Sequence, residues 1–302
     1  MSARSRAPYH QPSALVNVFH TIAQFRAARA QAKEPLGLVP TMGALHEGHL
    51  SLARRARAEC ATAAMSIFVN PAQFGPHEDF SRYPRPVERD LQLAREAGID
   101  LVFNPPVEEV YPAGFSTYVE AEGPSRRWEG EHRLGHFRGV ATVVTKLFTI
   151  VEPQHAYFGQ KDYQQLAVVR RLVADLNLPV EVVGCPTVRE PDGLALSSRN
   201  VYLTPEQRPY AAALHAALQE GRRRVAAVAP QGVEAEQVRL VMERILLDTP
   251  GVTVDYVAVV DPDSLEPLEG PISAGRRVHG LIAARLGPVR LIDNMALSDT
   301  AS

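Results

Sequence analysis

Cysteine is scarce in this sequence, since 302 residues contain only Cys60 and Cys185. The two lie far apart and without metal-ligand spacing. That excludes a disulfide framework or a cysteine-based metal site and favours buried, reduced thiols in a cytosolic protein. The chain also lacks an apolar run long enough to span a bilayer. Its formal net charge of -2 gives no reason to expect nucleic acid or an anionic membrane as a partner.

Acidic residues are missing from the start of the chain, where none precedes Glu34. Basic residues do occur there, at Arg4, Arg6, Arg26, Arg29 and Lys33. An acid-poor start with Arg and Ser resembles a transit peptide, whereas a short disordered tail on a cytoplasmic protein explains it equally well. Because no clear cleavage context follows, we favour a disordered tail over residues 1–14.

The most informative stretch that is present runs from Leu38 to Leu50. An apolar run ends in a turn marked by Pro40 and Gly43, and His46 and His49 then open a helical pattern. The unpaired backbone N–H groups of a helix N-terminus form an anion site. Two imidazoles there add donors that become cationic when protonated. This stretch predicts a nucleotide-phosphate site.

The first part of the chain alternates strands and helices, which predicts right-handed crossovers and a parallel sheet. The expected strands are 36–39, 63–69, 99–103, 155–158 and 180–183, and the expected helices are 49–60, 86–97, 140–150 and 163–176. Residues 110–138 are irregular and could form a lid. Pro40, Asn70 and Gly159 each follow an expected strand. The pattern predicts a doubly wound, Rossmann-like sheet that binds ligands beyond its strand ends.

The composition changes near Cys185, and a second, smaller α+β domain is expected after it. A helix is predicted from Thr204, as N-cap, to the Arg222–Arg224 run, and another over 233–247. Strands are expected over 252–260, 278–285 and 289–292. We therefore predict an α/β fold with a Rossmann-like, nucleotide-binding domain over residues 1–186 and a smaller domain over 187–302.

The pair His46 and His49 allows three interpretations. A zinc protease motif needs His-Glu-x-x-His on one helix face, and Gly48 breaks that spacing. Two purely structural histidines at one helix N-terminus would be unusual packing. A phosphate site satisfies the helix dipole, the glycine and the charge requirement together, and we favour it.

Several further blocks make a resemblance specific. Pro40–His49 resembles the His-x-Gly-His signature of the nucleotidyltransferase superfamily, in the form carried by the pantothenate synthetase family. The resemblance continues in family order through Phe68–Phe74, Tyr83–Arg85, His136–Val140, Phe158–Gln165 and Leu196–Asn200. It implies an ATP-dependent ligase whose first domain also binds pantoate. Pantoate would be adenylated with release of pyrophosphate, and β-alanine would displace AMP to give pantothenate.

The resemblance also implies residue roles. His49, His46, Lys161 and Arg199 would be catalytic, with His49 as proton donor, because charge builds on the phosphate oxygens during transfer. Asp162 would bind the ribose hydroxyls, although a helix N-cap is its ordinary interpretation. The full set assigned to ATP is Pro40, Thr41, Met42, Gly43, Ala44, Leu45, His46, Glu47, Gly48, His49, Gly159, Gln160, Lys161, Asp162, Val188, Leu196, Ser197, Ser198 and Arg199.

Neutral amides are expected to hold the acid and the amine. By resemblance Gln73 would bind pantoate and β-alanine and Gln165 would bind pantoate, with Asn70 close by, since amides bind hydroxyls and a carboxylate without neutralising the nucleophile. ATP chemistry of this kind needs Mg²⁺, for which Asp90 is the candidate ligand. The family further implies a homodimer.

Two other functions remain open on the sequence. A nucleotidyltransferase that transfers AMP or CMP to a phosphate would want more cations than the set of Asn70, Gln73 and Gln165 provides. A nucleotide-binding regulatory module without turnover would not require His46, His49, Lys161 and Arg199 together.

Overall fold

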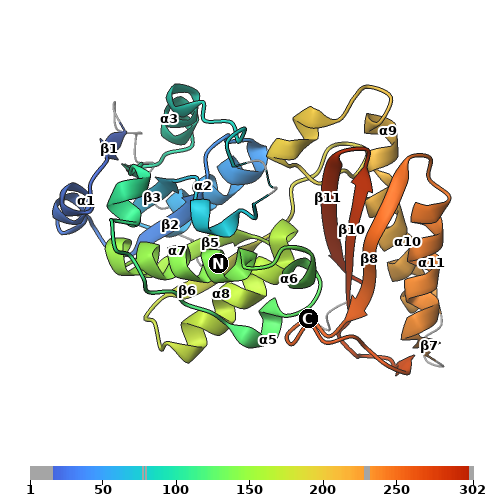
Figure 1. Cartoon of the computed structure of the whole chain (residues 1–302). Helices are drawn as coiled ribbons and strands as arrows, with labels where there is room; N and C mark the ends of the chain where they lie inside the picture. Colours follow the sequence, from blue (N-terminus) through green and yellow to red (C-terminus); the bar gives the residue numbers. More distant parts are fainter. Residues whose placement is uncertain (1–15, 77, 79, 228–231, 299–302) are drawn as a thin grey trace, which may run out of the picture.

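The fold is described from a computed structural model that covers residues 16–76, 78, 80–227 and 232–298. A parallel sheet with helices around it occupies the first part of the chain, and a smaller antiparallel sheet with two long helices occupies the second (Figure 1). The tail predicted over residues 1–14 lies outside the described residues.

Six strands of the described chain form the first sheet, in the order β1-β4-β3-β2-β5-β6, and every neighbouring pair is parallel. These strands are β1 (Asn17–Phe19), β2 (Leu36–Thr41), β3 (Thr62–Ile67), β4 (Leu101–Phe103), β5 (His155–Gly159) and β6 (Glu181–Cys185). Parallel strands need helical crossovers, which cover both faces of such a sheet and bury it.

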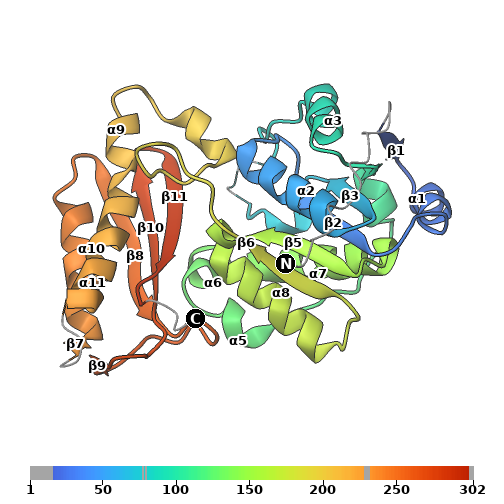
Figure 2. The ribbon, with the colours of Figure 1, turned by 180° about the vertical axis from the view of Figure 1, so that it is seen from behind.

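The helices do divide between the two faces. One face carries α1 (Ile22–Arg29), α7 (His136–Val151) and α8 (Tyr163–Asp175), and the other carries α2 (Glu47–Glu59) and α3 (Val87–Glu96) (Figures 1 and 2). Side chains alternate accordingly along β2, where Leu36 and Leu38 pack with the first group and Val39 with the second. The doubly wound α/β fold is confirmed.

The strand order reverses between β2 and β5, because the chain builds outward to β3 and β4 before it returns to the other side of β2. The connections after β2 and β5 therefore diverge, which leaves a crevice at their carboxyl ends. Thr41 ends β2 and Gly159 ends β5. Pro40, expected after the strand, lies inside β2.

The segment between β4 and α7 is irregular, as predicted, and contains only short helices: α4 (Val107–Val110), α5 (Glu122–Ser125) and α6 (Glu129–His132). Trp128 reaches out of it, and its Nε1 donates to the backbone oxygen of Leu265 in the second sheet region, at 2.9 Å. Movement of this segment as a lid stays a prediction.

The second domain has the predicted α+β composition. Its sheet runs in the order β11-β10-β8, all antiparallel, from β8 (Val252–Val260), β10 (His279–Leu286) and β11 (Val289–Ala296). Helices α10 (Ala213–Ala227) and α11 (Ala235–Leu247) pack on one face around Leu218, Met242 and Ile282. A short pair, β7 (Val233–Glu234) and β9 (Pro271–Ile272), lies at its end. The boundary at residue 186 stays a prediction.

The other face of this small sheet packs against the first domain. Ala258, Val260, Leu265 and Leu281 form a cluster with Trp128, Tyr163, Ala167 and Tyr256. Since Trp128, Tyr163 and Ala167 come from the first domain, both faces of the second sheet are covered. Strand β10 is accordingly buried at seven of its eight positions.

Three local details differ from the predictions. Thr204 does cap the start of a helical segment, since its Oγ1 accepts from Gln207 N and its backbone oxygen accepts from Arg208 N, but the expected single helix is divided into α9 (Arg208–Ala211) and α10. The helix expected from Val233 starts at Ala235, since Val233 pairs in β7. Strand β1 and helix α1 were missed, although Phe25 is fully buried.

Both cysteines are free and buried, as predicted. Burial raises the pKa of the Cys60 thiol and of the Cys185 thiol, which keeps both protonated and unreactive at neutral pH. Within the residues that the structure covers, no helix is long and apolar enough to cross a membrane.

A glycine of α7 allows the segment after β3 to approach the helix closely. A Cβ at Gly139 would lie 2.2 Å from the backbone oxygen of Ala72 and 2.6 Å from Cα of Gln73. Gly139→Ala should therefore lower the free energy of unfolding by about 1–3 kcal/mol, through overpacking. Urea unfolding measures this. The control is Gly123→Ala, whose Cβ would meet nothing within 4 Å, and equal stability of the two variants would contradict the prediction.

Candidate functional site

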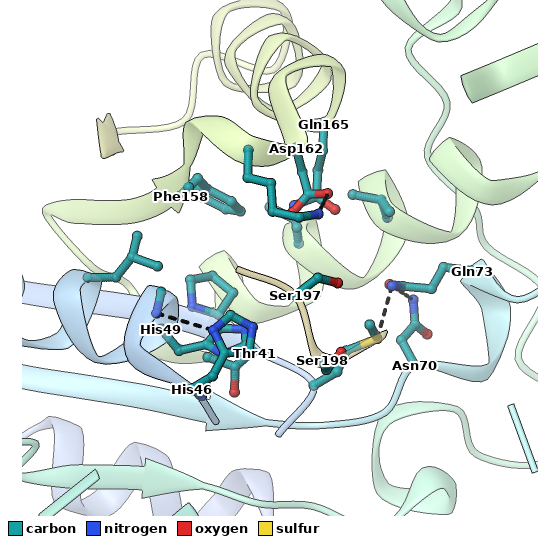
Figure 3. A pocket seen from close by; sticks show the side chains of 18 of the residues that line it. Thr41, His46, His49, Asn70, Gln73, Phe158, Asp162, Gln165, Ser197 and Ser198 are labelled. Carbon is teal, nitrogen blue, oxygen red and sulfur yellow. Dashed lines mark hydrogen bonds and ion pairs between the residues drawn. The ribbon is translucent and has the colours of Figure 1, made fainter. Parts of the chain in front are cut away.

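A cavity of about 220 Å³ opens at the carboxyl ends of β2 and β5. It adjoins a second cavity of about 660 Å³ between the domains, and the two share Arg133, Lys161, Asp162, Ser197 and Arg199. Figure 3 shows the predicted residues converging on the first cavity from the His46 helix, the Asp162 loop, the Ser197 loop and the Gln73 segment. The two cavities together offer room for a nucleotide and a small acid.

His46 and His49 are in contact at the N-terminus of α2, with ring centroids 4.1 Å apart and ring planes tilted by 40°. Nδ1 of His46 accepts from Gly48 N at 3.2 Å, and Nδ1 of His49 accepts from His46 N at 3.4 Å. Each Nδ1 is therefore unprotonated, which assigns the proton of each neutral ring to Nε2. The backbone of the helix N-terminus thus fixes which nitrogen of each ring can donate to a ligand.

Both imidazoles are neutral at pH 7. Burial, helped by the Lys161 charge, lowers the pKa of His46 to about 4, and burial together with His46 lowers the pKa of His49 to about 3. The sequence suggested donors that become cationic when protonated. Here they are neutral N–H donors, and the fixed positive charge comes from Lys161 and Arg199 instead.

Asp90 holds the turn between β2 and α2. Its Oδ2 accepts from Ala44 N and its Oδ1 from Leu45 N, both at 2.8 Å, and the residue is 1% exposed. Ala44 has a left-handed φ of 50°, so the turn needs this fixation. Both carboxylate oxygens are committed to the backbone. This geometry does not support the prediction that Asp90 binds Mg²⁺, and it gives the residue a structural role.

Lys161 and Asp162 follow β5 and face the cavity. The Lys161 Nζ lies 3.4 Å from Oδ1 of Asp162. Burial alone would raise the pKa of Asp162, but the Lys161 and Arg199 charges lower it below its usual value, so the carboxylate is ionised. Asp162 occupies the N-cap position of α8 without a side-chain capping hydrogen bond. Its carboxylate is therefore not used for capping, and it faces the cavity.

Ser197, Ser198 and Arg199 enter the site from a hairpin. Leu196 N donates to the backbone oxygen of Val188 at 3.0 Å, which closes the hairpin. Ser197 Oγ accepts from Arg199 N at 3.3 Å and caps the short helix η3 (Ser198–Tyr202). Val188, Leu196 and the three loop residues all line the cavity.

Asn70 and Gln73 form a fixed amide pair after β3. Nδ2 of Asn70 donates to Oε1 of Gln73 at 3.0 Å and to Gly139 O at 3.1 Å. Oδ1 of Asn70 accepts from Ala72 N at 3.3 Å and from the hydroxyl of Tyr111 at 2.7 Å. Every hydrogen-bonding position of Asn70 is thus filled. It orients Gln73 and has no position left for a ligand. Nε2 of Gln73 donates to Sδ of Met42 at 3.1 Å, and both of these residues line the cavity.

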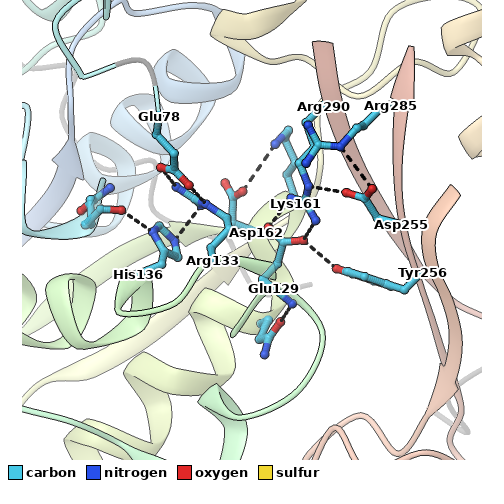
Figure 4. A network of polar contacts seen from close by, with 12 residues as sticks. Glu78, Glu129, Arg133, His136, Lys161, Asp162, Asp255, Tyr256, Arg285 and Arg290 are labelled. Atoms are coloured by element: carbon cyan, nitrogen blue, oxygen red, sulfur yellow. Dashed lines mark hydrogen bonds and ion pairs between the residues drawn. The ribbon is translucent and has the colours of Figure 1, made fainter. Parts of the chain in front are cut away.

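A chain of contacts supports the backbone of Gln73 (Figure 4). Nδ1–H of His136 donates to Gln73 O at 2.8 Å, and Nε2 of His136 accepts from Arg133 at 3.0 Å. Arg133 forms a two-pronged pair with Glu78, at 2.7 and 2.8 Å. Burial and the Arg133 charge lower the pKa of His136 to about 4. In the sequence His136 was only part of a motif, with no role assigned to it.

A second group in Figure 4 joins the domains. Arg290 of β11 pairs with both oxygens of Glu129, at 2.6 and 2.7 Å, and with Asp255 at 2.7 Å. The hydroxyl of Tyr256 donates to Glu129 at 2.9 Å. Glu129 is 6% exposed, so it is a buried carboxylate with all of its charge compensated.

The apolar wall of the cavity was not predicted from the sequence. Helix α7 is buried nearly all round, and one of its faces both belongs to the core and lines the cavity. Its lining residues are Val140, Val143, Val144 and Leu147, and Phe68, Phe74, Tyr83, Tyr157, Phe158, Pro186 and Thr187 add to them. Periodicity detects burial and does not tell a core face from a cavity face.

Most of the predicted residues line the cavity, and Gln165 is among them. Asp90 does not, nor do five of the residues assigned to ATP: Gly43, Ala44, Leu45, Glu47 and Gln160. Ala44 and Leu45 direct their N–H groups to Asp90, and Glu47 points away to pair with Arg54. The predicted contact of these five with a nucleotide has no basis in the cavity's shape.

Asp90→Asn tests the structural role of this carboxylate. The amide would place an NH₂ group against one backbone N–H, so the free energy of unfolding should fall by about 1–3 kcal/mol. Urea unfolding with and without Mg²⁺ measures it, with the exposed Glu88→Gln on the same helix as control. A loss that appears only when Mg²⁺ is present would contradict the structural role.

The neutral histidines predict a loss of stability in acid. The pKa of His49 is about 3 in the fold against the usual 6.5, so the unfolded chain binds the proton more readily as pH falls below about 6.5. Between pH about 7 and about 4.5, the free energy of unfolding of His49→Gln should therefore fall by about 1–2 kcal/mol less than that of the wild type. Urea unfolding across this range, with exposed His132→Gln as control, checks it. An equal fall in the free energy of unfolding of the wild type and of His49→Gln over this pH range would refute the prediction.

Known proteins share this sequence pattern and fold. The model of the pantoate-beta-alanine ligase family matches residues 17–296. The pantothenate synthetase of Chloroflexus aggregans is 57% identical over 282 residues, which cover 93% of this chain and 100% of the relative. That of Moorella thermoacetica is 54% identical over 283 residues, which cover 94% and 98%.

Solved structures agree. The crystal structure of pantothenate synthetase from Thermus thermophilus matches with a TM-score of 0.87 and 53% identity, over 94% of this chain and 100% of that chain. The pantoate-beta-alanine ligase of Francisella tularensis, complexed with beta-gamma ATP and beta-alanine, matches with a TM-score of 0.75 and 32% identity, over 95% and 100%. The chain belongs to the pantoate-β-alanine ligase family.

Proposed function

We propose that this protein condenses (R)-pantoate with β-alanine to pantothenate through a pantoyl adenylate, with release of pyrophosphate and AMP. The observation that carries the proposal is the arrangement of the cavity. Phosphate-type donors at His46, His49 and Lys161 line one part, and the amides of Gln73 and Gln165 with the apolar face of α7 line another. An ATP site beside an acid site built from neutral amides suits carboxylate adenylation.

The acid would bind where amides and apolar side chains meet. Asn70 fixes the Gln73 amide so that its NH₂ group donates to a carboxylate or hydroxyl oxygen. The quaternary dimethyl carbon of pantoate would pack on Val143 and Val144 of α7. A cation here would pair with the carboxylate and weaken it as a nucleophile, so the neutral amides keep it reactive.

In the first step a pantoate oxygen attacks the α-phosphorus of ATP. The new P–O bond forms while the bond from the α-phosphorus to the bridging oxygen breaks, and pyrophosphate leaves. Nε2–H of His46 and of His49, with Lys161, would donate to the phosphate oxygens on which charge develops. Ser197, Ser198 and Arg199 would hold the β- and γ-phosphates, and Asp162 would accept from the ribose hydroxyls.

In the second step the β-alanine amine attacks the carbonyl carbon of the adenylate. A C–N bond forms, the C–O bond to AMP breaks and the amine loses a proton. Gln73 and Gln165 would position the acyl group, and the small cavity would hold the amine close to the carbonyl carbon. Water must be kept out until the amine arrives, which the apolar wall of α7 favours.

Among the described residues no dedicated magnesium site is found. Asp90 has both oxygens bound to backbone amides, and this part of the chain contains no cluster of three potential metal ligands. We propose that Mg²⁺ arrives as part of the MgATP substrate, bound through phosphate oxygens and water. A homodimer, which the family implies, and a cytoplasmic location, which the two reduced cysteines favour, stay predictions.

The activity is tested directly by incubating the protein with ATP, Mg²⁺, D-pantoate and β-alanine and following AMP, pyrophosphate and pantothenate. We expect all three products in equal amounts, and no AMP when pantoate is omitted. AMP formed only with another acceptor would refute the substrate. A nucleotidyltransferase with a phosphate acceptor is the competing activity, and the neutral amides of Gln73 and Gln165 disfavour it.

His49→Ala should cripple adenylation while leaving the fold intact, because His49 offers a donor to the transferred phosphate and its loss removes that stabilisation. We expect a fall in kcat of about 100-fold or more. Pyrophosphate release in a single turnover measures the step, and the urea midpoint measures the fold. An unfolded variant would make His49 structural, whereas a folded and fully active one would exclude it from the reaction.

A further inference from the structure

Asp293 and Asn294 are consecutive residues of β11 in the second domain. Asn294 contacts the loop that carries Lys161, and Asp293 contacts the hairpin that leads to Arg199. Nδ2 of Asn294 donates to the backbone oxygens of Gln160 and Lys161, at 2.9 and 2.8 Å. The residue is 7% exposed. A single side chain of the second domain thus holds the two peptide units that flank the Cα of Lys161.

The orientation of this amide is fixed from behind. Both Nδ2 protons are used, so Oδ1 of Asn294 faces Nε2 of His279 on β10, at 2.9 Å. Since an amide oxygen can only accept, Nε2–H of His279 donates to it. The His279 ring stacks on the Tyr163 ring, at 3.8 Å and 14°, and the Tyr163 hydroxyl donates to Pro262 O at 3.0 Å. Loop 160–163 is therefore bound to the second domain at both of its ends.

The neighbouring Asp293 anchors the other loop. Arg189 binds both of its oxygens, at 2.7 and 2.8 Å, and also donates to Gly193 O at 2.9 Å. Arg189 pairs with Ala195 across the hairpin that leads directly into Ser197. Asp293 is 4% exposed, so the ion pair is buried and has fixed geometry.

We propose that Asn294 and Asp293 are positioning residues which set the Lys161 loop and the Ser197–Arg199 loop in register with each other. The inference rests on the proposed function, in which these loops grip the triphosphate. The two loops follow different strands, β5 and β6, so each could shift without the other. Asp293 and Asn294, adjacent on β11, fix the positions of the two loops relative to the same strand. A shift of about 1 Å in such a loop can lower the rate about 100-fold.

A double-mutant cycle between Asn294 and Lys161 tests the proposal. Asn294→Ala should lower kcat for pyrophosphate release by about 10–100-fold in the wild type. In a Lys161→Ala background it should lower kcat by less than about 2-fold, because the group that it positions is already gone. Multiplicative losses in the two backgrounds would mean that Asn294 does not act through Lys161, and would overturn the proposal.

The matched control is Trp128→Phe. It also removes a side-chain donor from a backbone carbonyl across the domain contact, but at Leu265, and it leaves the hydrogen bonds of Asn294 and Asp293 in place. We expect a similar loss of unfolding free energy and an unchanged kcat. A fall in kcat equal to that of Asn294→Ala would show that any weakening of the domain contact reduces the rate, and the specific role would be wrong.

Nucleotide binding separates this inference from the proposed function. By calorimetry, Asn294→Ala should bind ATP about 10-fold more weakly and 2′,3′-dideoxyadenosine equally well, because this nucleoside has neither the phosphates nor the ribose hydroxyls that contact the displaced loops. Equal weakening of both would refute the positioning role. This readout needs no pantoate, so a wild type that binds ATP and makes no pantothenate would overturn the proposed function alone.

A second variant covers the case in which Asn294→Ala does not fold. Asn294→Asp keeps the shape and the acceptor for His279 but places an oxygen against the carbonyls of Gln160 and Lys161. The same selective loss of ATP binding is expected. For the other loop, Arg189→Lys loses the two-pronged contact, and its effect on kcat should vanish in an Arg199→Ala background. Persistence of that effect would remove Asp293 from the proposal.

Discussion

The site depends on one constraint of the sheet, which is that β2 and β5 are neighbours although the chain between them builds the other edge. Their connections must leave in opposite directions, so neither covers the carboxyl ends of the two strands. The turn after β2 delivers the histidines at a helix N-terminus, and the turn after β5 delivers Lys161 and Asp162. The position of the site thus follows from topology before any side chain is considered.

Around this crevice, buried polar residues divide into two kinds. Asp90 and Asn70 have every oxygen or amide proton committed to protein partners, so they hold backbone and side chains in place. Gln165, Ser198 and the Nε2 atoms of the histidines face the cavity instead. Burying a polar group costs little free energy when all of its hydrogen bonds are made within the protein. Such groups also fix the positions of the neighbouring groups that face the cavity and can bind a ligand.

Five of the six strands of the parallel sheet and most of the longer helices could be predicted because apolar periodicity and strand-helix alternation are local. The converging loops could be placed because parallel strands end at one edge, and the family motifs named the side chains. Long-range partners could not be predicted. Nothing near Asp90 in the sequence indicates that its carboxylate binds Ala44 N and Leu45 N. Asn294 likewise lies far along the chain from the loop that it holds, inside a strand to which the pattern assigned no role.

The second sheet has a further consequence for how the molecule unfolds. Helices α10 and α11 cover one of its faces, and Trp128, Tyr163 and Ala167 of the first domain cover part of the other. A chain that began near residue 187 would leave Val260 and Leu281 facing water, which favours aggregation over an independent fold. The two domains should therefore melt together as one cooperative unit, and the protein cannot be divided into freely exchangeable modules despite having two cores.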